Sequence, residues 1–224
     1  MLEGWVDAVV SVTGGDLYAV AFVAGGICAL LTFLGSLPAL AGAKLGSRTL
    51  DVGLGFSAGI MLVASFTSLI LPGIEVGGVW SVLVGISAGS LTVHVINKCI
   101  PHEHLVKGFE GPESLRSKVK AIWLMVFAII IHNFPEGLAV GTGVAYSVRD
   151  GLMLALAIGI QDVPEGLAVS MPLVGIGMGK AKALFVALLS GLSELLMAMI
   201  PVAIASTSTH ILPFLMGFAG GSMI

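Results

Sequence analysis

The chain has 224 residues, of which 57% are hydrophobic and 10% are charged, whereas roughly 25% of the residues in a soluble domain are charged. This composition excludes an ordinary soluble globule and predicts an all-α, polytopic transmembrane helical bundle. The net charge of -3, without a basic face, also excludes a nucleic-acid-binding protein. The two cysteines, Cys28 and Cys99, form neither a disulfide framework nor a zinc knuckle.

Charge-free or nearly charge-free stretches predict the membrane spans in chain order. The first six are 17–43, 52–74, 76–97, 121–148, 151–179 and 183–205. Each is long enough for a helix to cross about 30 Å of hydrocarbon at roughly 1.5 Å per residue. A seventh begins near Thr209 and is still incomplete at Ile224. We therefore predict a single transmembrane domain over 1–224 with seven visible spans, the last of them incomplete.

Basic residues are distributed unevenly over the connections between these spans. The connections after spans one, three and five hold two, five and two Lys or Arg residues, whereas Arg149 alone follows span four. By the positive-inside rule, the side with nine basic residues is cytoplasmic and the N-terminus lies outside. The segment 98–120 is then a mobile cytoplasmic loop, in which His102, Glu103 and His104 either collect metal or are solvated.

Spans four and five contain a repeat, 132–140 and 161–169, in which six consecutive residues, PEGLAV, are identical. Apolar bias could repeat Leu-Ala-Val, but it would not repeat the preceding Pro-Glu-Gly. The polar members of the repeat are His132, Asn133 and Glu136 in the first copy and Gln161, Asp162 and Glu165 in the second. On a helix each set projects from one arc about 100° wide. Each of the two spans therefore presents a polar face of ligand-type groups.

Four carboxylates lie in the middle of predicted spans, where no Lys or Arg accompanies them: Glu136, Asp162, Glu165 and Glu194. A central acidic residue costs about 3 kcal/mol if it faces lipid unpaired. The group could be protonated structural glue, a proton relay or a site for divalent cations. The third alternative fits best, because two divalent ions balance four carboxylates. The imidazole of His132 favours zinc, iron(II), manganese, cobalt or cadmium over magnesium or calcium.

At these residues the chain resembles the ZIP (ZRT/IRT-like protein) metal transporters, whose fourth and fifth helices carry an HNxPEG motif and a partner ending in PEG. The resemblance is specific over 121–205 and points to a bacterial homologue. It implies eight helices with both termini outside, a location in the cell inner (plasma) membrane, and movement of zinc, or of cadmium, iron or manganese, into the cytoplasm. The expected partners are divalent metal ions and the lipid bilayer, without nucleic acid, and a homodimer is a possible assembly.

The resemblance also implies a two-metal site, which we carry over by position. One ion would be held by His132, Glu136, Gln161, Asp162 and Glu165, with Met61 as a thioether ligand. The neighbouring ion would be held by Asn133, Glu136, Asp162, Glu165 and Glu194. Zinc or cadmium would be bound as transported substrate, and neither catalytic residues nor a catalytic cofactor is implied. The family is expected to work by alternating access, with one group of helices sliding against another.

The main alternative from another class is a membrane-embedded metalloenzyme of the di-iron or zinc protease type. Di-iron bundles use Glu-x-x-His pairs, and zinc proteases use His-Glu-x-x-His. This chain has His-Asn-x-x-Glu instead, with no second histidine on spans four to six. The sequence therefore predicts a transporter and not an enzyme. A passive channel and an efflux protein are the alternatives within transport.

Overall fold

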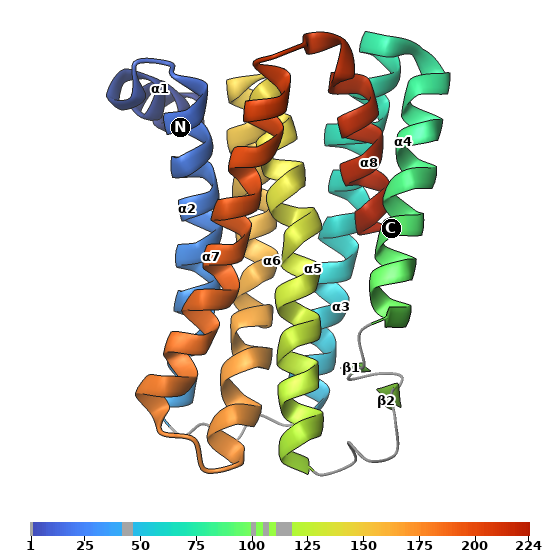
Figure 1. The fold of residues 1–224 in the computed structure, drawn as a ribbon. Coiled ribbons are helices and arrows are strands. Elements are labelled where there is room, and N and C mark those ends of the chain that lie inside the picture. The colour runs from blue at the N-terminus through green and yellow to red at the C-terminus, as the bar shows by residue number, and fades with distance from the viewer. Residues whose placement is uncertain (1, 42–46, 100–101, 105–107, 111–117) are drawn as a thin grey trace.

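The structure, a computed structural model, describes residues 2–41, 47–99, 102–104, 108–110 and 118–224. Its α-helices are α1 (Leu2–Thr13), α2 (Leu17–Ser36), α3 (Ser47–Ala64), α4 (Leu71–Cys99), α5 (Lys118–Tyr146), α6 (Val148–Gly175), α7 (Lys180–Ala205) and α8 (Leu212–Met223). Five helical stretches among the described residues are long and apolar enough to cross a membrane. The predicted all-α, multi-pass helical bundle is thereby confirmed (Figure 1).

One of the five stretches, Arg48–Ile96, joins two spans without a loop. A straight helix of its 49 residues would be about 70 Å long, more than twice the membrane core. The chain reverses at Gly78, whose φ of 77° and ψ of 165° are readily adopted by glycine. A π-helical turn, η2 (Ser65–Ile70), links α3 to α4 before this point. Spans two and three therefore run antiparallel, as α3 and α4 do in Figure 1.

Short elements that the sequence did not predict lie at both ends of the bundle. The helix α1 lies across the end of α2 at the top of Figure 1 and is too short to span the membrane. Between α4 and α5, the strands β1 (His102–His104) and β2 (Gly108–Glu110) pair antiparallel. The predicted loop 98–120 thus contains a small hairpin, and its residues 100–101, 105–107 and 111–117 lie outside the described residues.

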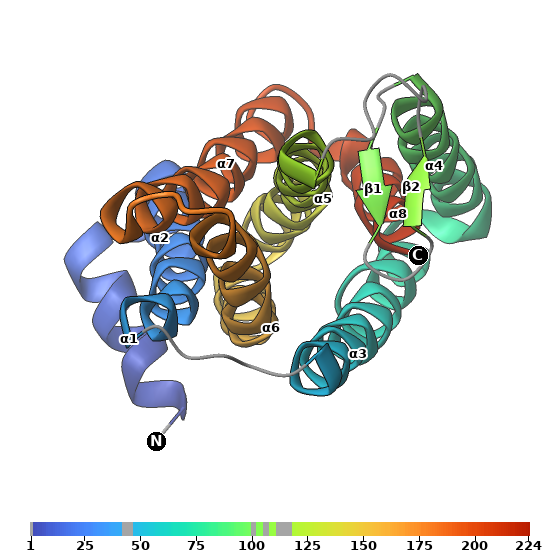
Figure 2. The same ribbon diagram turned by 90° about the horizontal axis from the view of Figure 1, so that it is seen from below.

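The membrane helices form two groups, which Figure 2 shows side by side. The first group contains α2, α5, α6 and α7, and the second contains α4 and α8 together with α3, which joins them through η2 and also packs against α6. In the first group, glycines bring helix backbones together. A Cβ atom at Gly137 of α5 would collide with the carbonyl of Glu194 on α7, and one at Gly166 of α6 would collide with the carbonyl of Thr32 on α2. The first contact brings α5 against α7, and the second brings α6 against α2.

Packing is looser along the boundary between the two groups. A cavity of about 610 Å³ lies between α3 and α6, where Ile60 and Ala157 are among its lining residues. A second cavity, of about 360 Å³, separates α8 from α5 and α7, and its lining includes Phe214 and Thr142. The boundary therefore holds open pockets with apolar linings.

Candidate metal centre

Six of the predicted ligands are brought together in the interior of the first helix group. They are Asn133 and Glu136 on α5, Gln161, Asp162 and Glu165 on α6, and Glu194 on α7. Glu165 is 9% exposed and the other five are at most 1% exposed. Pro135 lies inside α5 beside the site and, lacking an N–H, leaves the carbonyl of Ile131 without its helical partner. The repeat therefore forms one buried polar seam.

The acidic side chains of this seam form two overlapping groups of potential metal ligands. In one group, ligand atoms of Glu136, Asp162 and Glu165 all lie within 4.8 Å of one another. In the other, Cys28 on α2 joins Asp162 and Glu194 within the same distance. Asp162 belongs to both groups and connects them. Two neighbouring cations held by these groups would share its carboxylate.

In two of these carboxylates, Glu194 and Glu136, one oxygen accepts hydrogen bonds from amide or hydroxyl donors. The Asn133 amide donates from Nδ2 to Glu194 Oε1 at 2.8 Å, and the Thr32 hydroxyl reaches the same oxygen at 3.5 Å. The Gln161 amide donates to Glu136 Oε1. In turn, the Ser57 hydroxyl of α3 donates to the backbone carbonyl of Gln161 at 2.7 Å. These bonds orient the carboxylates and leave their second oxygens facing the seam.

Six side-chain oxygens of the seam are buried without a hydrogen-bond partner among the described residues. They are Asn133 Oδ1, Glu136 Oε2, Gln161 Oε1, Asp162 Oδ1, Asp162 Oδ2 and Glu194 Oε2. An acceptor buried without a donor costs free energy. Oxygen atoms that converge without donors can instead coordinate a cation.

The structure does not bring the other two predicted ligands, His132 and Met61, into either acidic group. The side chain of His132 is turned about 100° from that of its neighbour Asn133 and lines a cavity of about 120 Å³ beside Val93 of α4 and Phe218 of α8. Met61 lies on α3, in the second helix group, and is partly buried against the apolar core. Their roles as metal ligands stay predictions from the resemblance.

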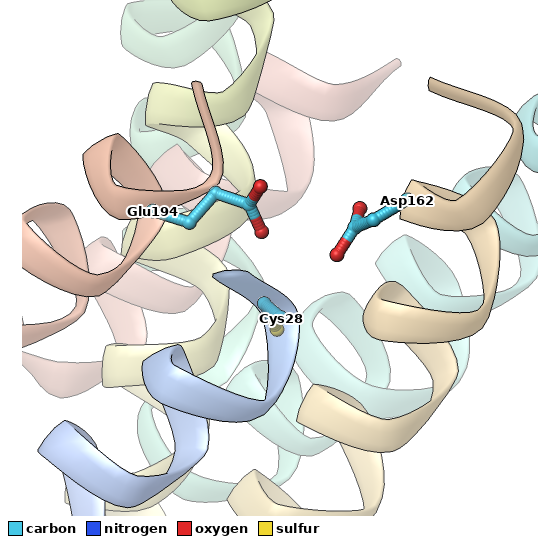
Figure 3. A group of neighbouring side chains, drawn as sticks. All are labelled: Cys28, Asp162 and Glu194. Carbon is cyan, nitrogen blue, oxygen red and sulfur yellow. The ribbon is translucent and has the colours of Figure 1, made fainter. Parts of the chain in front are cut away.

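Cys28 is the residue of this site that the sequence analysis missed. Its side chain is fully buried, and its Sγ lies within 4.8 Å of a ligand atom of Asp162 and of Glu194, next to which Figure 3 shows it. The sequence offered one faint signal, because Cys28 and Thr32 are four residues apart and so share a helix face. That face can be assigned to the metal centre only when α2 is known to pack against α6 and α7.

Comparison with known proteins identifies the family of the chain. The family described as ZIP Zinc transporter matches residues 101–224, which include the whole repeat and Glu194. The zinc transporter ZIPB of Bordetella bronchiseptica is 44% identical over 220 residues, covering 92% of this chain and 69% of that protein. The zinc transporter GufA of Myxococcus xanthus is 36% identical over 212 residues, covering 90% and 83%.

A third relative extends the similarity to another bacterial group. The zinc transporter ZupT of Streptococcus mutans is 34% identical over 192 residues, which cover 80% of this chain and 73% of that protein. The family match spans more than half of the chain, and the similarity to these relatives reaches into the spans before it. The chain therefore belongs to the ZIP zinc transporter family.

Proposed function

We propose that this protein transports divalent transition-metal cations, zinc foremost, across the cell inner membrane into the cytoplasm through the buried seam of α5, α6 and α7. The observation that carries the proposal is the set of six buried oxygens without a hydrogen-bond partner, gathered around four carboxylates. Membership of the ZIP family supports divalent metal transport. Cadmium, iron and manganese are further candidate substrates, because carboxylates and imidazole also bind these ions.

The proposed site holds two ions that share carboxylates. The ligands of the first are Met61, His132, Glu136, Gln161, Asp162 and Glu165, and those of the second are Asn133, Glu136, Asp162, Glu165 and Glu194. Shared carboxylates let an ion exchange one ligand at a time, whereas a closed four-ligand site would retain it. His132 lines a cavity at the boundary between the helix groups, and both it and Met61 would approach the carboxylates when the groups shift.

The proposed orientation places the N-terminus outside and the loop 98–120 in the cytoplasm, within one transmembrane domain. Arg48 lies near the start of α3, Lys98 lies near the end of α4, and Lys180 is the first residue of α7. The antiparallel order of the helices puts these ends at one side of the bundle (Figure 1). The Lys180 ammonium also donates to the carbonyl of Leu40 at 2.6 Å, at the end of the 3-10 helix η1 (Leu37–Ala41). Positive charge at this end supports a cytoplasmic location.

Uptake by sealed vesicles tests the proposed function and its enzyme alternative together. The purified protein is reconstituted into proteoliposomes that enclose a zinc-sensitive dye, and zinc is added outside. We expect zinc to accumulate inside without any chemical turnover. Oxidation of a substrate or cleavage of a peptide, without zinc accumulation, would support a metalloenzyme instead. Empty liposomes give the background leak.

Substitution of His132 tests the ligand set that the resemblance implies. We expect His132→Ala to lower zinc binding and uptake roughly tenfold or more, because an imidazole ligand is lost. The matched control is His210→Ala, at an exposed position on the 3-10 helix η4 (Thr209–Ile211), which should change neither quantity. Zinc binding to the detergent-solubilised variants and uptake by vesicles measure both effects. If the two variants behave alike, His132 is not a ligand.

A further inference from the structure

We propose that the Cys28 thiol is a metal ligand, and that it forms with Asp162 and Glu194 a mixed thiolate–carboxylate site for a soft or borderline divalent cation such as cadmium or zinc. The inference rests on the proposed function, because two of the three ligands belong to the seam already described. It adds a helix, α2, and a ligand chemistry, sulfur, that the repeat on α5 and α6 does not contain.

The first support is the position of three ligand atoms on three different helices. Cys28 Sγ and one oxygen each of Asp162 and Glu194 lie within 4.8 Å of one another. Ligands of a tetrahedral zinc ion lie roughly 3.5 Å apart, so shifts of about 1 Å would close the site around an ion. All three side chains are 0% exposed. Figure 3 shows the two carboxylates facing each other across a gap with Cys28 at its edge.

The second support is that the two carboxylates direct unpartnered oxygens into this gap. Both oxygens of Asp162 and the Oε2 atom of Glu194 are buried without a hydrogen-bond partner among the described residues. The other oxygen of Glu194 accepts a hydrogen bond from the Asn133 amide at 2.8 Å, which orients the carboxylate. A cation placed between these oxygens would satisfy them and would have the sulfur of Cys28 within reach.

The contacts of Cys28 include a carboxylate of the seam. Its Sγ donates a weak hydrogen bond to the carbonyl of Ala155 at 3.4 Å and also lies within hydrogen-bonding reach of the Glu194 carboxylate. The rest of α2 contains no Asp, Glu, His, Lys, Arg or Met. A sulfur atom placed next to two anionic oxygens is suited to bind a metal as thiolate, with its proton released on binding.

A thiolate ligand has a consequence for the choice of metal. Thiolates bind cadmium and zinc well, whereas manganese and magnesium prefer oxygen ligands. The site between α2, α6 and α7 should therefore favour the softer ions over manganese. Replacing the sulfur by oxygen in Cys28→Ser should lower the ratio of cadmium to manganese affinity roughly tenfold or more.

The test uses the ultraviolet absorption that arises from charge transfer between a thiolate and a bound metal. The full chain carries Cys99→Ser, which leaves Cys28 as the sole thiol. Purified protein is titrated with cadmium while bound metal and absorption are recorded together. We expect the thiolate band to grow with the bound cadmium and to vanish in the Cys28→Ser derivative. Met61→Leu should retain the band, because a thioether does not produce a thiolate transition.

The outcomes separate this inference from the proposed function. Cadmium bound in stoichiometric amounts without a thiolate band overturns the role of Cys28 and leaves the carboxylate site standing. Failure of the monodisperse protein to bind cadmium or zinc at all overturns both. The decisive reading is made on the protein that retains Cys28, so it does not depend on the folding of the Cys28→Ser variant.

Discussion

Replacing Asp162 by Asn is expected to lower zinc affinity and zinc uptake roughly a hundredfold. Asp162 belongs to both groups of acidic ligands, and both of its oxygens are buried without a partner. The substitution keeps the size of the side chain but removes one negative charge and one ligand oxygen from the point where the two proposed ions meet. Isothermal titration and vesicle uptake measure the loss.

The same substitution should make the metal-free protein more stable. A buried carboxylate without a partner opposes folding, so its neutral amide is expected to raise the metal-free unfolding midpoint by at least about 2 °C. The matched control is Asp150→Asn, an exposed residue in the first turn of the same helix, which should leave binding unchanged and should not raise the midpoint, because an acidic residue at this end stabilises the helix. Loss of binding together with loss of stability would show that Asp162 is structural.

Gly166→Ala should destabilise the protein by about 1–3 kcal/mol through overpacking. The added Cβ would collide with the backbone carbonyl of Thr32, where α6 crosses α2. Because backbone cannot move aside as a flexible side chain can, the two helices must separate. We expect the unfolding midpoint in detergent to fall by roughly 5 °C and zinc affinity to fall with it, since Thr32 and Cys28 lie on the displaced helix.

Gly175→Ala on the same helix is the control for this change. A Cβ atom at Gly175 has nothing within 4 Å, so no collision follows. Alanine is a better helix former than glycine by up to about 1 kcal/mol, and the control should therefore be unchanged or slightly more stable. If both alanine variants lower the midpoint equally, the close contact between α2 and α6 does not exist as described.

The sequence was sufficient to predict the spans and most of the polar seam. Gaps between charges located the helices, because a membrane span tolerates few charged side chains. The repeat predicted that Glu136 and Asp162 would face one interior, because side chains one turn apart share a helix face. Asn133, Glu136, Gln161, Asp162, Glu165 and Glu194 then came together in the fold.

Features that depend on which helices are neighbours could not be predicted in the same way. Cys28 gains its significance only from the packing of α2 against α6 and α7. The direction of His132 towards α4 and α8 reflects a turn of about 100° from Asn133, which no pattern in the sequence related to a particular neighbour. The charge pattern placed the break between spans two and three at Glu75, whereas the chain reverses three residues later, at Gly78.

The most direct test is a crystal structure of the zinc-loaded protein with anomalous data collected at the zinc edge, because the buried carboxylates of α5, α6 and α7 are proposed to hold the transported metal. We expect anomalous peaks among Glu136, Asp162, Glu165 and Glu194, and the loss of these peaks in Asp162→Asn. Zinc bound only at surface positions, with the seam closed by hydrogen bonds between the acidic side chains, would contradict this proposal.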